Sequence, residues 1–459
     1  MRRYRRFLLP FYLMLSACMP VTPADTPTRA ASFSASDLPA MKTFAVPRPA
    51  PALRSNSDIA RDFLDLSFKL ESGRALPSFS RFEGPITVRV TGNAPAALDS
   101  DLRRLLHRFR TEAQIPIAQA EGGKPANILI HAVSRKAIRK ALPQAACFVV
   151  PNVTSLSDYK RLRRTQALNW ARITERETIS IFIPNDSSPQ EMRDCLHEEL
   201  AQSLGPLNDL YRLSDSVFND DNVHTVLTGF DMLVLRATYD PALRSGMTRA
   251  EVAARLPGIL SRINPRGDTL APNRAARTPR VWIDAIETAL GPGTKPAARR
   301  KAATEALQVA SAMGWQDHRR AFSHYAMGRL MLSSNPQRAK AEFAAARVYY
   351  SNTRNSNLHL AYVASQLAAY ELTQDRPELA LSLVNPHIDT AARHENAALL
   401  ATLMMLKAEA LDIMGRVSEA REVRMDSLGW ARYGFGPDWA VRAKLREIAS
   451  LSPLKGIRG

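Results

Sequence analysis

The fold of this chain is decided by residues 194–209, which read Asp-Cys-Leu-His-Glu-Glu-Leu-Ala-Gln-Ser-Leu-Gly-Pro-Leu-Asn-Asp. The apolar run 178–183 before this stretch is typical of a buried strand, and Ser188-Pro189 is typical of a helix start. His197-Glu198 opens the pattern H-E-x-x-H, in which two histidines on one helix face bind zinc. Position 201 is alanine, so the second histidine is missing in this register.

A shift of one residue gives a longer match. Glu198-Glu199-x-x-Gln202-x-x-Gly205-x-x-Asn208 has the spacing of the metzincin signature H-E-x-x-H-x-x-G-x-x-H, with every zinc-binding histidine replaced. In a working metzincin the three histidines hold zinc, and the glutamate takes a proton from the bound water. The resemblance therefore makes Glu199 a vestigial base and Gly205 the turn, and the degenerate ligand positions are Glu198, Gln202 and Asn208.

The chain downstream continues this resemblance. Phe218-Asn219-Asp220 stands where a metzincin has its methionine turn, with Phe218 in place of methionine, and residues 227–240 look like the closing helix. Residues 56–262 as a whole resemble an uncharacterised family of bacterial secreted proteins with a zincin-like domain of unknown function. That family's hallmark is a helix of the type Glu-x-x-x-Gln-x-x-Gly-x-x-Asn-Asp followed by a Phe-Asn-Asp turn, which adds Asp209 and Asp220 to the motif.

The element order agrees with the resemblance. We expect strands at residues 85–91, 115–118, 126–133 and 147–150 and helices at 58–71, 98–112 and 159–170, all before the strand 178–183. A metzincin shows such a β-α-β-β-β-α order before its active-site helix. The fold class expected is therefore α+β, with a metzincin-like mixed sheet.

The replaced ligands leave three interpretations open. One carboxylate and two amides should hold zinc poorly, since zinc prefers imidazole and thiolate. The three side chains could fill the former metal site with hydrogen bonds, or line a cleft that binds a peptide or glycan. The third possibility is a divergent hydrolase, with or without zinc, that uses Glu199 with Asp209, Asp220, Asp221 or His224. We expect no metal or cofactor under the first two, and His197 should lie beside the site in a structural role.

The N-terminus predicts a lipid anchor. Residues 1–17 contain four arginines followed by an apolar run, as in a secretory signal peptide, and Leu15-Ser16-Ala17-Cys18 resembles the lipobox of bacterial lipoproteins. An ordinary cleaved signal is the alternative. With Cys18 lipidated and Met19 next to it, we expect a periplasm-facing protein of the cell envelope, at the outer rather than the inner membrane. Residues 18–55 are rich in Pro, Ala, Ser and Thr and should form a disordered tether.

The remaining cysteines, Cys147 and Cys195, predict a disulfide, because a lone pair in an oxidising compartment is most simply a bridge. It would join the strand at residues 147–150 to the signature helix. A catalytic cysteine is the alternative, for which no convincing base is in sight.

The C-terminal half is expected to be entirely helical. Residues 263–300 read as a linker with a short helix near 281–290, and residues 301–450 as a tetratricopeptide-like domain. The alanines Ala339, Ala380 and Ala420 recur about every 40 residues, a period typical of stacked helical hairpins. A nonrepetitive helical bundle remains the alternative.

The charge balance by itself excludes few classes of function. The formal charge of +18 falls to +14 without the four arginines of the predicted signal, since 58 basic residues then stand against 44 acidic ones. Outside the cytoplasm this charge would meet no nucleic acid. We therefore expect a noncatalytic lipoprotein adaptor, anchored in the membrane through Cys18 and bound to a protein partner through its helical repeats. The alternative is a divergent metallohydrolase acting on peptide or peptidoglycan.

Overall fold

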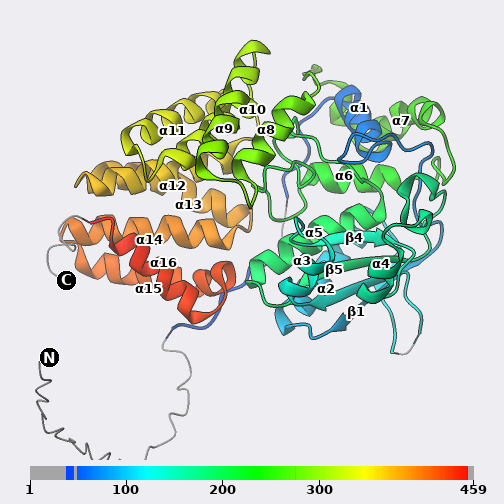
Figure 1. The fold of residues 1–459 in the computed structure, drawn as a ribbon, viewed down its shortest axis with the longest axis horizontal. Helices are drawn as coiled ribbons and strands as arrows, with labels where there is room; N and C mark the ends of the chain where they lie inside the picture. The colour runs from blue at the N-terminus through cyan, green and yellow to red at the C-terminus, as the bar shows by residue number, and fades with distance from the viewer. Residues whose placement is uncertain (1–37, 46–48, 123, 274, 453–459) are drawn as a thin grey trace, which may run out of the picture. The chain divides into compact units, whose positions relative to one another are not determined.

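The computed structural model describes residues 38–45, 49–122, 124–273 and 275–452 (Figure 1). The predicted signal peptide and Cys18 lie outside these residues. Within them the fold is α+β, with one five-stranded mixed sheet and sixteen α-helices, most of which follow the sheet in sequence. Among the described helices, none has the length and apolar character needed to cross a membrane.

The sheet has the strand order β2-β1-β3-β5-β4. Its first four strands in this order are parallel, and β4 pairs with β5 in the antiparallel direction. Every residue of β5 is buried, which explains its continuous apolar sequence. The strand bounds are Ile86–Gly92 for β1, Ile117–Gln119 for β2, Ile128–Val133 for β3, Phe148–Pro151 for β4 and Ile179–Pro184 for β5.

The predicted strands are confirmed to within a few residues, but two helices around β4 differ from expectation. The helix α3 (Arg135–Ala141) was not expected, because its sequence is basic and offers only Ile138 and Ala141 to the core. The predicted helix 159–170 is instead α4 (Leu156–Leu162), which begins at the N-cap Ser155 and is followed by two short 3₁₀ turns.

In the half of the molecule that contains the sheet, five helices build the core with the sheet, and α5 lies against β5 and β4 (Figure 1). Capping boxes begin two of them: Thr228 with Asp231 at α6, and Thr248 with Glu251 at α7. The helices are α1 (Asn56–Ser67), α2 (Ala96–Thr111), α5 (Pro189–Leu204), α6 (Gly229–Thr238) and α7 (Arg249–Ile263).

The helical half consists of consecutive helices that pack side by side, from α9 in green to α15 in red (Figure 1). The three anchor alanines, Ala339, Ala380 and Ala420, are all buried, and each lies on the second helix of a hairpin. The helices are α8 (Arg280–Leu290), α9 (Pro296–Ala312), α10 (His318–Met331), α11 (Pro336–Ser351), α12 (Asn357–Thr373), α13 (Pro377–Arg393), α14 (Ala397–Ile413), α15 (Val417–Phe435) and α16 (Asp438–Ala449).

Within the hairpins the helices approach closely. A Cβ atom at Gly328 on α10 would lie 2.7 Å from a ring carbon of Phe343 on α11, so only glycine fits at this crossing. The helix α8, inside the segment predicted as a linker, buries Trp282 against Tyr211 with ring centroids 5.0 Å apart. The 263–300 segment is therefore packed against the sheet-containing half in this region.

Candidate functional site

The signature helix α5 begins as its sequence predicts. The Ser188 hydroxyl accepts a hydrogen bond from the Glu191 N–H, and Pro189 occupies the first turn, where no N–H is needed. The helix ends at Gly205, where an added Cβ would lie 2.8 Å from the Thr238 side chain on α6. Glycine is thus required by the close approach of α6.

A disulfide joins Cys147, next to β4, to Cys195 on α5, which confirms the predicted pairing. The bond fixes the side of α5 one turn before Glu198 and Glu199. The first turns of α5 contact the helical half: the Arg193 guanidinium pairs with Glu395 at 3.2 Å, and the Ala398 N–H donates to Gln190 Oε1 at 2.9 Å. The helix is therefore held by a covalent bond and by buried polar contacts.

The degenerate ligand positions face different partners. Asn208 donates its amide to the backbone oxygen of Asp65 at 3.0 Å, and Gln202 hydrogen-bonds Glu71. The Arg176 guanidinium donates to the backbone oxygens of Gln202 and Gly205, each at 2.6 Å. Among the described residues, no hydrogen bond joins Glu198, Gln202 and Asn208 to one another.

Five carboxyl groups lie close enough for their charges to interact, and we call them the acid cluster: Glu71, Glu198, Glu199, Asp209 and Asp220. Burial and the neighbouring negative charges raise the pKa of Glu198 to about 8 and that of Asp220 to about 6. The same causes raise the pKa of Glu199 and Asp209 well above their usual range.

The acid cluster has few donors. The Tyr211 hydroxyl donates to Asp220 at 2.8 Å, Gln202 bonds Glu71, and Glu71 shares a hydrogen bond with Asp209. In the part of the chain that the structure describes, none of the five carboxyls forms an ion pair with lysine or arginine. No group of three or more His, Cys, Asp or Glu side chains there is arranged to hold a metal ion.

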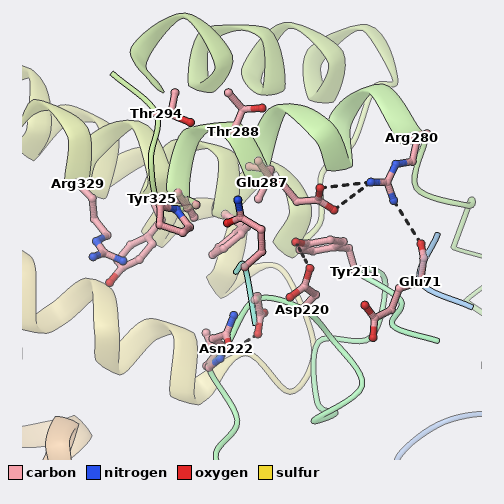
Figure 2. Close-up of a pocket in the computed structure, with 18 of the residues that line it drawn as sticks. Glu71, Tyr211, Asp220, Asn222, Arg280, Glu287, Thr288, Thr294, Tyr325 and Arg329 are labelled. Carbon is pink, nitrogen blue, oxygen red and sulfur yellow. Dashed lines mark hydrogen bonds and ion pairs between the residues drawn. The ribbon is translucent and has the colours of Figure 1, made fainter. Parts of the chain in front are cut away.

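A pocket of about 890 Å³ opens in front of the acid cluster, lined by Glu71 and Asp220 on one side. Figure 2 shows the Tyr211 hydroxyl pointing at Asp220, and Arg280 spanning Glu287 and the backbone of Glu71. Helices α8, α10 and α12 of the helical half also line the pocket, and Phe322, Tyr325 and Tyr362 are among their lining residues.

Sequence reasoning missed Glu71, Tyr211, Arg280 and Glu287. Glu71 lies in a turn after α1, and the other three come from distant segments, so no spacing relates any of them to the signature. An acidic residue at the end of an otherwise apolar predicted helix was the only available signal, and it is a weak one.

The remaining predicted residues have structural partners. The His197 ring accepts a hydrogen bond from the Leu227 N–H at 3.1 Å, and burial lowers its pKa well below the usual range. Asp221 contacts His359 on α12 at 2.8 Å, and the His224 ring lies 5.9 Å from that of His359. Phe218 is fully buried in the core.

The comparison with protein families finds one match. Residues 56–258 match the model of a family described as a protein of unknown function, DUF2927, so a DUF2927 domain is present in the chain. The match begins where the predicted domain begins and ends close to residue 262. Neither the curated proteins nor the solved structures contain a match to this chain.

Proposed function

We propose that this protein is a membrane-anchored lipoprotein of the cell envelope that binds a protein or envelope partner without catalysis. In this proposal residues 56–262 are a zincin-like domain that has lost its chemistry, and residues 301–450 are tetratricopeptide-like repeats that contact the partner. Cys18 carries the lipid and places the protein in the periplasm, at the outer membrane.

The proposal rests mainly on one observation: the side chains at two of the degenerate ligand positions are engaged by other parts of the protein. The Asn208 amide is committed to the backbone of α1, and Gln202 is engaged with Glu71. The other end of the same helix is built into the contact with the helical half through Arg193 and Glu395. A helix whose polar side chains serve packing at both ends fits a binding module better than a catalytic one.

Two further observations support the finer parts of the proposal. The Cys147–Cys195 disulfide is the kind of bond that persists in oxidising compartments, in agreement with secretion. Buried small residues recur on the second helix of each hairpin, at Ala339, Ala380 and Ala420, as stacked repeats require.

The proposal is tested by metal analysis of the protein purified without chelator. We expect no stoichiometric zinc, an unchanged melting temperature after EDTA treatment, and no hydrolysis of peptide or peptidoglycan substrates. Glu199→Gln should change neither the metal content nor the absence of hydrolysis, with the exposed Glu121→Gln as the matched control. Stoichiometric zinc, together with a hydrolytic activity that Glu199→Gln abolishes and Glu121→Gln preserves, would establish the metallohydrolase instead.

Anchoring is tested separately by the substitution Cys18→Ser. We expect the variant to leave the membrane fraction and to lose incorporation of labelled fatty acid, while the wild-type protein retains both. Equal membrane association of the two proteins would contradict the lipid anchor and leave the binding proposal untouched.

A further inference from the structure

The acid cluster differs from an ordinary polar network in one respect: within the described residues its carboxyl groups have no cationic partner. Glu199 is only 5% exposed, and no hydrogen bond to its carboxyl group exists within the described residues. It lies close enough to Glu198 and Glu71 for their charges to act on it. One carboxyl atom of the cluster, Asp209 Oδ1, is buried without a hydrogen-bond partner. Leaving buried polar atoms unpaired costs free energy, which a bound positive group would recover.

The pocket provides access to this unpaired charge. Glu71 and Asp220 belong both to the acid cluster and to the pocket wall, so a group in the pocket contacts the cluster directly. The volume of about 890 Å³ lies in the range of ligand sites and accepts more than a single ion. Figure 2 shows Arg329 on the side of the pocket away from Glu71, and Arg280 already neutralised by Glu287. Arg280 reaches the acidic end, where it donates to the backbone oxygen of Glu71, but its ion pairs are with Asp284 and Glu287 and not with the acid cluster.

The walls suit an alkyl chain that ends in a cation. Tyr211, Phe322, Tyr325 and Tyr362 also line the pocket. Aromatic rings pack against methylene groups and attract a cation placed over their faces. The acidic end is also an exception on this chain, whose formal net charge is +18. Charge and shape together favour a flexible organic cation.

We propose that this pocket binds a primary ammonium group on an alkyl chain, as in a lysine side chain of a polypeptide, with Glu71 and Asp220 as its direct partners. The proposal rests on the proposed function, since it names the chemistry that the binding module recognises. Glu198, Glu199 and Asp209 lie behind the two direct partners and add to the negative potential. The aromatic wall holds the methylene chain.

The proposal is tested by isothermal titration calorimetry of the full chain in low salt at pH 8.0. The probes are acetyl-Gly-Lys-Gly-amide, its neutral analogue acetyl-Gly-Gln-Gly-amide, and spermidine. We expect the lysine peptide to bind and the glutamine peptide not to bind. Binding of spermidine without the lysine peptide would assign the site to free polyamines, and binding of the peptide without spermidine to polypeptides; both support the ammonium chemistry.

The pH dependence supplies a readout that needs no variant. Cation binding requires ionised carboxyls, so affinity should fall on going from pH 8.0 to pH 5.5. With the pKa of Asp220 at about 6, ionisation of this group alone predicts a decrease of about fourfold, and Glu198 adds to it. Binding at pH 7 should also release protons, which titrations in phosphate and Tris buffers detect. Binding that is pH-independent and releases no proton would overturn the proposal.

Variants complete the test. Glu71→Gln combined with Asp220→Asn should weaken lysine-peptide binding about tenfold or more, while Glu121→Gln, at an exposed ion pair, should not change it. Equal binding of the glutamine peptide, equal binding by the double variant, or binding of zinc in place of the peptide would each refute the ammonium site. If the peptide does not bind and the metal analysis finds no zinc, only this inference fails and the noncatalytic proposal stands.

Discussion

Two acid-rich regions of the sheet-containing half differ in one property, the presence of cations. In the first, Asp62 and Asp65 on α1 receive the guanidinium of Arg212 at 2.7 and 3.0 Å, and Lys69 contacts Asp65 at 2.9 Å. In the second, the acid cluster around Glu199, no described lysine or arginine pairs with any of the five carboxyls.

The pKa values record this difference. Burial alone would raise the pKa of Asp65, but its hydrogen bonds and charge contacts with Lys69 and Arg212 lower it below the usual range. In the acid cluster burial acts with neighbouring negative charges, and the pKa of Glu198 rises to about 8. A paired buried carboxylate contributes to the fold, whereas unpaired carboxyls oppose it and gain from a ligand.

The largest effect on the free energy of unfolding is expected in the first region, around Asp62 and Asp65, which we call the paired region. Arg212→Met should lower the free energy of unfolding by about 3–5 kcal/mol, because it leaves Asp62 and Asp65 buried without their main cation. Urea denaturation followed by circular dichroism measures the change. The exposed Arg416→Met, which breaks the ion pair with Glu419, is the matched control and should have no measurable effect. Equal stability of the two variants would remove the distinction between the regions.

A smaller effect on the free energy of unfolding is expected from the disulfide. This bond fixes α5 beside the acid cluster, which we call the unpaired region. Replacing Cys147 and Cys195 together by alanine should cost about 2–4 kcal/mol, since the bond closes a long loop in the unfolded chain. The same urea assay measures it. In the wild-type protein, thiol labelling after unfolding without reductant should find neither of these cysteines free. Labelling of both would contradict the bridge.

The smallest effect is the pH dependence of the unpaired region. The pKa of Glu198 is raised from 4.5 to about 8 in the folded state, so the folded protein binds more protons between these values. The contribution of the Glu198 carboxyl group to stability is therefore present below pH 4.5 and lost as pH rises toward 8. Glu198→Gln should gain on the order of 1 kcal/mol relative to wild type between pH 5 and pH 6. Urea titrations at both values test this.

For the paired region we expect the opposite dependence of stability on pH. The pKa of Asp65 is lowered, so its stabilising contribution is present above pH 3.8 and lost as pH falls through the folded value. Wild type should therefore be more stable than Asp65→Asn, by a margin that shrinks in acid. It should be less stable than Glu198→Gln, by a margin that shrinks as pH falls toward 4.5. The same sign for both variants would contradict the comparison.

The sequence was informative where the signal is local. Ser188-Pro189 began α5, Thr248 and Glu251 formed a capping box with the usual spacing of three residues, and the apolar run 178–183 became the buried strand β5. These features depend on residues within one or two turns of each other. The disulfide was also predicted, because only two candidate cysteines remained.

The acid cluster and its pocket were decided by the tertiary structure. Glu71, Tyr211 and Glu287 come from three segments that meet only when α1, the loop after α5 and α8 pack together. Pairing, too, is a property of the folded state: Asp65 and Glu71 are close in sequence, yet only Asp65 reaches cations. Local pattern determined the helices and strands because their hydrogen bonds are local, and long-range packing alone set which charges were neutralised.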